Sequence, residues 1–260
     1  MDPTHVLSAS SASSASPRWV LTYVDLPYAF PMTTLSIIVP TLNEAPNIES
    51  ALRALAPLRA QGHEVIVVDG GSQDFTVQLA SPLADIVLSA SRGRAAQMNV
   101  GVHEARGDVL LFLHADTRLP ADADKHVLQG LADGRLVWGR FDVRIAGRHP
   151  LLILIARTMN LRSRLTAICT GDQAIFVRRE VLIRLGGYPD IDLMEDVALS
   201  RILRRVSRPL CLRTPVTTSG RRWESRGVWQ TMLLMWWLRL RYFFGTSPAR
   251  LVRIYDDDRR

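Results

Sequence analysis

The sequence predicts an α/β fold in which a mostly parallel sheet is flanked by helices, and two observations support this prediction. From residue 34 onward, short runs rich in Val, Ile and Leu alternate with stretches that carry apolar residues at helical spacing. The short runs are apolar at successive positions, which is typical of strands covered on both faces. We therefore expect ligands to bind beyond the carboxyl ends of the strands.

The individual elements follow from the same patterns. The first half of the sequence predicts a strand, a helix and three further strands, at 35–40, 47–59, 64–69, 85–88 and 108–113. The second half is less regular and predicts strands at 136–145 and 174–177 and helices at 151–165, 197–206 and 228–244. We expect residues 1–33 to be a disordered or over-called tail, residues 34–226 to be one domain, and residues 227–260 to be an amphipathic helix and tail.

Composition and charge exclude several classes of protein. The apolar share of 47% and the charged share of 22% exclude wholesale disorder, and two cysteines cannot form a disulfide scaffold or a four-thiolate zinc site. Residues 1–130 hold 8 cations and 13 acids, whereas residues 131–260 hold 24 cations and 12 acids. This asymmetry favours a metal or hydroxyl-rich ligand on one side and an anion on the other. The arginines are scattered singly through apolar helices, which argues against nucleic-acid binding.

The sequence also bears on location and partners. The longest late run without a charge, 227–238, is 12 residues long, which is too short to span a bilayer. The first residues lack the basic start and the long apolar run of a secretory signal. We therefore expect a cytoplasmic protein without membrane contact, in which the Trp-rich helix at 228–244 is a core or homodimer face.

Polar residues gather where the predicted strands end. The first strand is followed by Asn43 and Glu44, the second ends at Asp69, and the fourth is followed by His114 and Asp116. Capping of the following helices explains one or two of these acids, Asp69 among them. Acids at three neighbouring strand ends indicate a ligand site.

Five motifs carry a resemblance to a known family. They are SIIVPTLNE at 36–44, VVDGGSQD at 67–74, SRGRAAQMN at 91–99, FLHADT at 112–117 and GDQAIFVR at 171–178, with the acidic pair Glu195 and Asp196 downstream. Together they resemble the family-2 glycosyltransferases, which have the nucleotide-sugar-binding GT-A fold. More narrowly, they resemble the branch associated with radical-enzyme and selenium gene clusters, which contains the selenosugar synthases of selenoneine biosynthesis. The resemblance covers roughly residues 34–240.

The resemblance implies a donor site at the first strand ends. It assigns uridine binding to Pro40, Asn43, Glu44 and Asp69, and carboxylates suit that role because they accept hydrogen bonds from the uracil N–H and the ribose hydroxyls. Arg92 and Arg94 open the next helix, whose dipole and guanidinium groups favour a diphosphate. The alternative for Arg94 is a solvated helix face.

The metal motif departs from the family pattern. Family-2 enzymes usually carry Asp-x-Asp, whereas this chain has His114 in the first position and Asp116 in the last. By the resemblance, Asp116 binds Mg²⁺ or Mn²⁺ together with diphosphate oxygens and water. Three roles are open for His114, namely a metal ligand, a hydrogen-bond donor to the sugar or a packed side chain. A role as magnesium ligand is the least favoured of the three.

The later motifs are assigned to catalysis and the acceptor. Glu195 and Asp196 align with the acidic pair that supplies the general base, although such a pair also occurs as a simple helix N-terminal charge pair. Acceptor and phosphate binding fall to five residues, namely Asp172, Gln173, Arg221, Arg222 and Trp223. One of the two adjacent arginines is expected to face water, because consecutive side chains diverge.

The resemblance implies an inverting transferase that moves GlcNAc or glucose from a UDP-sugar to selenophosphate and forms a C–Se bond. The alternative is an O-glycosyltransferase that acts on a lipid phosphate or a metabolite hydroxyl. A basic membrane-surface or nucleic-acid-binding module, a different class of protein, would leave the acids at the strand ends unexplained.

Overall fold

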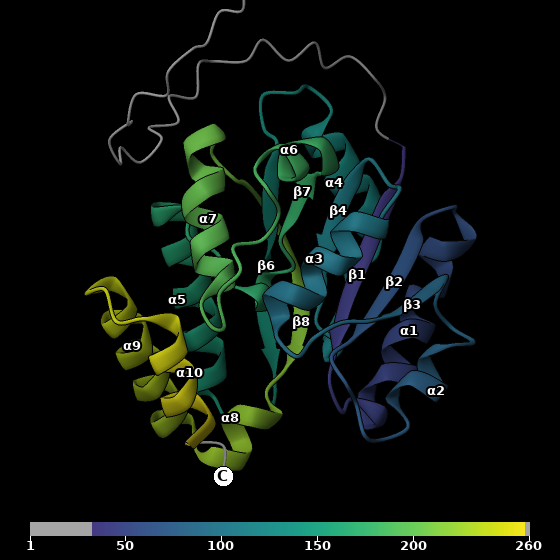
Figure 1. Cartoon of the computed structure of the whole chain (residues 1–260). Helices are drawn as coiled ribbons and strands as arrows, with labels where there is room; N and C mark the ends of the chain where they lie inside the picture. Colours follow the sequence, from purple (N-terminus) through teal and green to yellow (C-terminus); the bar gives the residue numbers. More distant parts are fainter. Residues whose placement is uncertain (1–32, 258–260) are drawn as a thin grey trace, which may run out of the picture.

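The structure is a computed structural model that describes residues 33–257 (Figure 1). The tail expected over residues 1–33 therefore lies outside the described residues except for Thr33. The elements, in chain order, are β1 (Leu35–Thr41), α1 (Ala45–Ala60), β2 (Glu64–Asp69), α2 (Thr76–Ala80), β3 (Ile86–Ser89), α3 (Arg94–Glu104), β4 (Val109–Phe112), β5 (Thr117–Arg118), α4 (Ala123–Leu131), β6 (Trp138–Ala146), α5 (Leu151–Thr166), the 3₁₀ turn η1 (Gly171–Gln173), β7 (Phe176–Arg178), α6 (Arg179–Arg184), α7 (Glu195–Val206), β8 (Leu210–Ser219), α8 (Arg221–Arg226), α9 (Val228–Phe243) and α10 (Pro248–Asp257).

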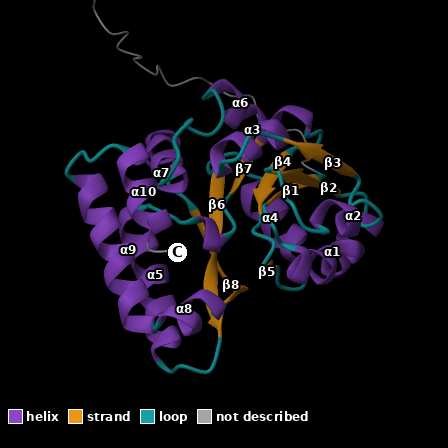
Figure 2. Ribbon diagram, turned by 60° about the horizontal axis from the view of Figure 1, so that its bottom comes forward, coloured by secondary structure: helices purple, strands orange, loops and turns teal. Residues whose placement is uncertain are grey.

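The strands form one eight-stranded sheet with the order β3-β2-β1-β4-β7-β6-β8-β5 (Figure 2). β3, β2, β1 and β4 are parallel neighbours, so their carboxyl ends meet at one edge of the sheet. β7 is antiparallel to both β4 and β6, whereas β8 is parallel to β6 and antiparallel to β5. The sheet is thus parallel in its N-terminal half and mixed in its C-terminal half. Because β7 opposes β4, the turn that precedes β7 lies beside the carboxyl end of β4.

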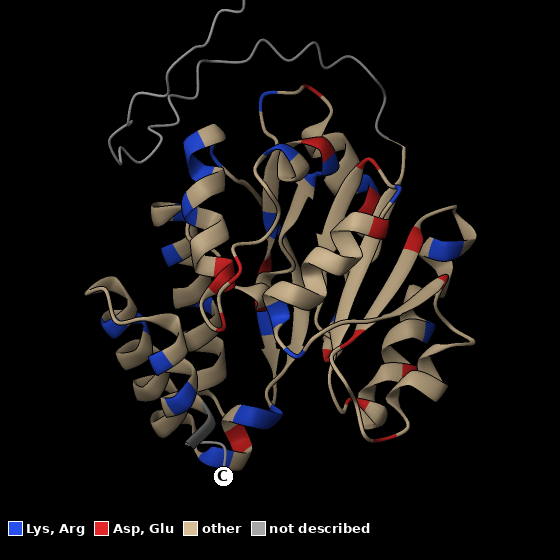
Figure 3. Ribbon diagram, in the orientation of Figure 1, with Lys and Arg blue, Asp and Glu red and all other residues tan. Residues whose placement is uncertain are grey.

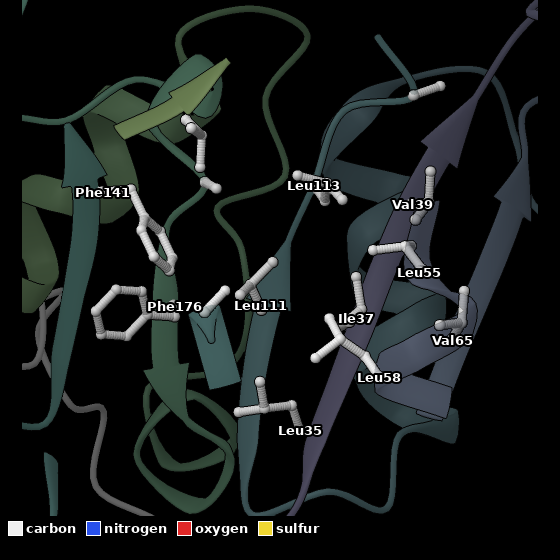
Figure 4. Close-up of a cluster of buried hydrophobic side chains, with 14 of the residues drawn as sticks. Leu35, Ile37, Val39, Leu55, Leu58, Val65, Leu111, Leu113, Phe141 and Phe176 are labelled. Carbon is white, nitrogen blue, oxygen red and sulfur yellow. The ribbon is translucent and has the colours of Figure 1, made fainter. Parts of the chain in front are cut away.

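The parallel strands are buried on both faces, which explains their continuous apolar sequences. In β1, Leu35, Ile37 and Val39 point into one core, which also holds Leu55 and Leu58 of α1 (Figure 4). The intervening residue Ile38 points into a second core on the opposite face. Side chains of a strand alternate between its faces, so each face of β1 needs its own layer of helices.

Helices α1, α2, α4 and α5 contribute to the first core, and α3, α6 and α7 contribute to the second. A third, smaller cluster joins α9 and α10 to the start of α7 through Val197, Leu238 and Leu251. The C-terminal helices therefore attach to the side of the sheet on which β6 and β8 lie (Figure 1). None of the helices among residues 33–257 is long and apolar enough to cross a membrane.

The predicted strands and helices are confirmed, and the structure adds elements that the sequence patterns did not indicate. β8 contains Pro215, which pairs with Asp142 where the register of β6 and β8 shifts. Because proline is uncommon inside strands, its presence makes the strand hard to predict from the sequence. The helix predicted at 228–244 is α9. The chain then turns at Gly245, which has φ 83°, and Pro248 starts the additional helix α10.

Candidate active site

A cavity of about 700 Å³ lies at the carboxyl ends of β1 and β4. Its lining comes from both halves of the chain, including Pro40 and Glu44 after β1, Asp116 after β4, and side chains of α5, α8, α9 and α10. A second cavity of about 340 Å³ adjoins it and reaches the start of α3 and the acidic residue Glu195. Pro40, Glu44, Arg94 and Tyr255 line both cavities, and we call these two adjoining cavities the recess.

The loops after β1 and β2 are tied together at the edge of this recess. Asn43 has a positive φ of 54°, its N–H donates to Ser72 Oγ (2.8 Å), and its Oδ1 accepts from the Gln73 N–H (2.8 Å). Asp69 Oδ2 accepts the N–H groups of Gly71 (2.9 Å) and Ser72 (2.8 Å). Neither Asn43 nor Asp69 lines the two cavities. Their side chains shape the loops that present Pro40 and Glu44, and their predicted uridine contacts stay predictions.

The start of α3 supplies two arginines to the recess. Gly93 precedes the helix with φ 140°, a conformation that glycine adopts without strain. Arg92 lines the smaller cavity and Arg94 lines both. Desolvation lowers the pKa of Arg94, but the surrounding carboxylates, foremost that of Glu195, raise it by more, so its pKa lies above its ordinary value. Arg94 is therefore a permanent positive charge between the two cavities.

His114 occupies the position of the first motif acid and is held between two parts of the η1 turn. Its Nδ1 lies 3.4 Å from Asp172 Oδ1. Its Nε2 is buried and has no hydrogen-bond partner among the described residues, and a Cβ on Gly171 would lie 2.5 Å from it. Because the imidazole is wedged against the Gly171 backbone, it acts as a packed partner of Asp172 and leaves no room for a metal ion at Nε2.

Asp172 is the acid that this arrangement keeps ionised. Desolvation raises its pKa, but the hydrogen bond with His114 and the charges of His114 and the nearby arginines bring the pKa below its ordinary value. The carboxylate faces the larger cavity and is 44% exposed. A carboxylate in this state accepts hydrogen bonds from sugar hydroxyls.

The acidic pair at the start of α7, Glu195 and Asp196, has raised pKa values, in contrast to Asp172. Asp196 accepts the N–H of Gly171 at Oδ2 (2.8 Å) and that of Val197 at Oδ1 (2.7 Å), which fixes α7 to the η1 turn. Burial raises the pKa of Asp196, and burial together with the Asp196 charge raises the pKa of Glu195. Raised values suit a general base that operates near neutral pH.

Asp116 also lines the larger cavity. Its Oδ1 accepts a long hydrogen bond of 3.4 Å from the Thr117 hydroxyl, and its backbone oxygen accepts the Ser219 N–H (3.1 Å). No group of three or more metal-ligating side chains occurs among the described residues. One carboxylate completed by substrate phosphates and water is a common way to bind Mg²⁺, so Asp116 fits a metal held jointly with a diphosphate.

Helix α8 closes the larger cavity with the predicted Arg/Trp element. Arg221 lies 4.0 Å from Glu44 and is 60% exposed. Arg222 stacks on the Tyr255 ring at 4.4 Å, donates a hydrogen bond to its hydroxyl, and is half-buried. This divergence of adjacent arginines is the expected one. Trp223 lines the cavity and packs against the first core.

Gln173 does not line the recess. Its side chain is fully buried, where Nε2 donates to Ser163 Oγ (3.0 Å) and Oε1 accepts the Thr170 N–H (3.4 Å). Gln173 therefore anchors the η1 turn to α5, and its predicted acceptor contact stays a prediction.

Arg162, Arg239 and Tyr255 are among the cavity-lining residues that the sequence did not indicate. Arg162 follows Ile155 and Met159 at helical spacing, so its place on the apolar face of α5 was a signal that could have been used. Its Nε and Nη2 are buried without a partner among the described residues, and desolvation lowers its pKa. Tyr255 belongs to α10, which the sequence did not indicate.

Fold and site together define a class of enzyme. Carboxylates and arginines that converge beyond the carboxyl ends of parallel strands suit a ligand with hydroxyls, a diphosphate and a bound cation. The sequence profile described as "Glycosyl transferase family 2" matches residues 36–186, which is more than half of the chain. The chain belongs to the family-2 glycosyltransferases.

Individual relatives are more distant. The chain is 27% identical over 252 residues to a poly-beta-1,6-N-acetyl-D-glucosamine synthase of Staphylococcus aureus, a match that covers 85% of this chain and 59% of that protein. It is 29% identical over 116 residues to an undecaprenyl-phosphate 4-deoxy-4-formamido-L-arabinose transferase of Pseudomonas fluorescens, which covers 40% of this chain and 34% of that one. The chain thus spans less than two thirds of the length of these relatives.

Solved structures agree with the fold. S. aureus TarS residues 1–349 in complex with UDP-GlcNAc matches with a TM-score of 0.60 and 21% identity, over 72% of this chain and 58% of that chain. Mannosyltransferase PcManGT from Pyrobaculum calidifontis, in complex with GDP-Man and Mn²⁺, matches with a TM-score of 0.56 and 24% identity, over 75% and 61%. The predicted GT-A-like α/β fold is confirmed by this likeness.

Proposed function

We propose that the protein is an inverting transferase that moves GlcNAc or glucose from a UDP-sugar to selenophosphate. The observation that carries the proposal is the pair of adjoining cavities whose lining includes Asp116, Arg94 and Glu195, with Asp196 next to Glu195 in the chain but outside the lining. Membership of the family and the polymer of N-acetylglucosamine named for the S. aureus relative support a UDP-GlcNAc-type donor. The five sequence motifs support the selenium-associated branch.

On this proposal, the donor lies along the edge formed by β1, α3 and β4. Pro40 and Glu44 contact the nucleoside, supported from behind by Asn43 and Asp69, and Arg92 and Arg94 bind the diphosphate. Asp116 would hold a divalent cation together with the diphosphate, and a bound cation would neutralise the negative charge of the leaving UDP. Arg94 adds a positive charge for the same purpose.

The acceptor enters from the side of α5, α8 and α9. The larger cavity is rich in arginine there, with Arg162, Arg222, Arg226 and Arg239 in its lining. Selenophosphate arrives as an anion, so these groups bind its phosphoryl end and direct selenium at the anomeric carbon. The C–Se bond forms as the bond between the anomeric carbon and the diphosphate oxygen breaks, and UDP leaves with the electron pair. Asp196 then acts through orientation, because selenium has no proton to lose.

A second candidate function has its own supporting observation. The raised pKa values of Glu195 and Asp196 suit a base that deprotonates an attacking hydroxyl. An O-glycosyltransferase acting on a metabolite hydroxyl, or on a lipid phosphate as in the name of the P. fluorescens relative, is the alternative.

One experiment separates the two. Purified protein is incubated with UDP-GlcNAc or UDP-glucose, Mg²⁺ or Mn²⁺, and either selenophosphate, a polyprenyl phosphate or simple alcohols, and products are examined by mass spectrometry. The isotope pattern of selenium on a sugar of β configuration supports the proposal. Transfer to an alcohol or lipid phosphate with none to selenophosphate overturns it in favour of the alternative. In the selenium reaction, Asp196→Asn should cost clearly less than the about 10²–10⁴-fold typical of a lost general base.

A further inference from the structure

Helix α9 carries a continuous apolar stripe on its outer side. Seven large side chains of this region are between 40% and 75% exposed, namely Trp229, Leu233, Trp236, Trp237, Leu240, Phe243 and Phe244. At ~100° per residue they fall within about one third of the helix circumference. The opposite side of α9 is covered, since Val228 and Leu238 are buried in the first and third cores. An aromatic stripe of this size is rare on a surface that meets only water.

The two charged residues of α9 itself are both positive. Arg239 and Arg241 flank the stripe on its two sides, and the Arg241 guanidinium lies 4.8 Å from the centre of the Trp237 ring. Neither α9 nor α5, which lines the larger cavity together with α9, contains an Asp or Glu. Figure 3 shows this concentration of cations on the C-terminal helices, in contrast to the N-terminal strands and helices.

A second copy of the chain is a poor occupant for this surface. In a two-fold symmetric contact each patch meets itself, so Arg241 and Arg239 would approach the arginines of the other copy. With no carboxylate on α5 or α9, such a contact would bury apolar area at the cost of unpaired like charges.

The surface of an anionic membrane can cover the apolar stripe and pair with the positive charges beside it. Trp and Phe side chains enter the boundary between headgroups and acyl chains, and arginines beside them contact lipid phosphates. α9 spans only Val228–Phe243 and, like every other described helix, does not qualify as a membrane span, so it would lie along the surface. Leu154, Leu161 and Leu165 of α5 are also exposed apolar side chains.

The stripe is also continuous with the recess described above. Trp236 is 63% exposed and at the same time lines the larger cavity, together with Met232 and Arg239 of the same helix. A membrane bound along the stripe would therefore lie beside the mouth of the cavity.

We propose that the outer face of α9, with Arg241 at its edge, binds the protein to the surface of an anionic membrane. The expectation of no membrane contact rested on the absence of a spanning run, and a helix that lies on a bilayer needs none. This inference is independent of the sugar donor and acceptor.

The test is co-flotation of the full chain with vesicles of phosphatidylcholine alone or mixed with phosphatidylglycerol. We expect binding to the anionic vesicles, weakened by high salt, and a blue shift of tryptophan fluorescence on binding. The variant Leu233→Gln/Leu240→Gln changes two exposed side chains outside the cavity lining, and its vesicle affinity should fall about tenfold or more. The matched control is Phe75→Gln, which removes a 71% exposed side chain next to α2, far from α9 in Figure 1.

Three results would overturn the proposal. The first is failure of the wild-type chain to bind anionic vesicles, and the second is an equal loss of binding in the α9 variant and the Phe75 control. The third is a wild-type chain that binds no vesicles and sediments as a dimer, while the α9 variant sediments as a monomer. That result would assign the stripe to a contact with a second copy. Arg241→Gln adds a check on the charges, because it should reduce the salt dependence of vesicle binding.

Discussion

Replacing Gly171 by alanine should disable the site through one methyl group. The new carbon would lie 2.5 Å from His114 Nε2 and 2.6 Å from His114 Cε1. Non-bonded heavy atoms prefer separations of about 3.5–4.0 Å, so the imidazole or the turn must shift by about 1 Å. The shift would pull His114 Nδ1 away from Asp172 and move the Gly171 N–H that Asp196 accepts.

The size of the effect follows from this displacement. Overpacking of this kind costs about 1–3 kcal/mol, which lowers Tm by about 2–4 °C per kcal/mol in a chain of this size class. A misplacement of about 1 Å in an active site lowers turnover about 10²-fold. UDP release from a UDP-sugar in the presence of acceptor gives turnover, and thermal unfolding of the same samples gives Tm.

A double-mutant cycle isolates the cause. His114→Ala removes the side chain that the methyl group meets, so adding Gly171→Ala in that background should change Tm and turnover little further. Wild-type turnover and Tm in Gly171→Ala alone would refute the reasoning. So would a penalty for Gly171→Ala that is just as large when His114 is already alanine.

Three further predictions concern groups at or near the site. Asp116→Asn should lower turnover by about two orders of magnitude or more at unchanged Tm, and EDTA should inhibit the wild type but have little further effect on the variant; full wild-type activity in EDTA would contradict the metal role. The pKa values of Asp196 and Glu195 are raised in the folded chain, so the folded chain keeps protons that the unfolded chain loses above a pH of about 4. The contribution of this pair to the free energy of unfolding is therefore present at low pH and declines as the pH rises through the raised values. Asp196→Asn should flatten that part of the profile of Tm against pH, and an unaltered profile would argue against this reasoning. Burial raises the pKa of Cys169 to about 12, so iodoacetamide should alkylate the half-exposed Cys211 in the native protein and both cysteines after denaturation, as counted by intact mass; two adducts on the native protein would be the contrary result.

The sequence was most informative where a single strand and its following loop make the structure. β1, β2 and β4 have continuous apolar sequences, which are typical of parallel strands buried on both faces. In the structure β1 pairs with both β2 and β4, so the ends of these strands lie side by side. Their polar ends therefore indicated the recess without knowledge of any tertiary contact. Asp69 illustrates the limit, since a carboxylate after a strand serves a turn as readily as a ligand, and here it accepts the N–H groups of its own loop.

The sequence was least informative where packing between distant segments makes the site. Gln173 looked like part of an acceptor motif, but the capping of η1 and the contact with Ser163 of α5 take its side chain inward. Arg162 lies among apolar residues of α5, and only the position of α9 opposite it turns that face into a cavity wall. Neither outcome is encoded in local spacing.

The stacking of Arg222 on Tyr255 has a consequence for the order in which the protein acquires its site during synthesis. β1 to β4 can pair as soon as the first half of the chain has left the ribosome, because all their sheet partners except β7 lie within it. The recess, in contrast, includes Tyr255 of α10, so its wall is complete only when nearly the whole described chain has emerged. Until that moment Glu44, Arg94 and Asp172 face water where the structure has a cavity wall. Nucleotide binding is therefore expected to require the docking of α10.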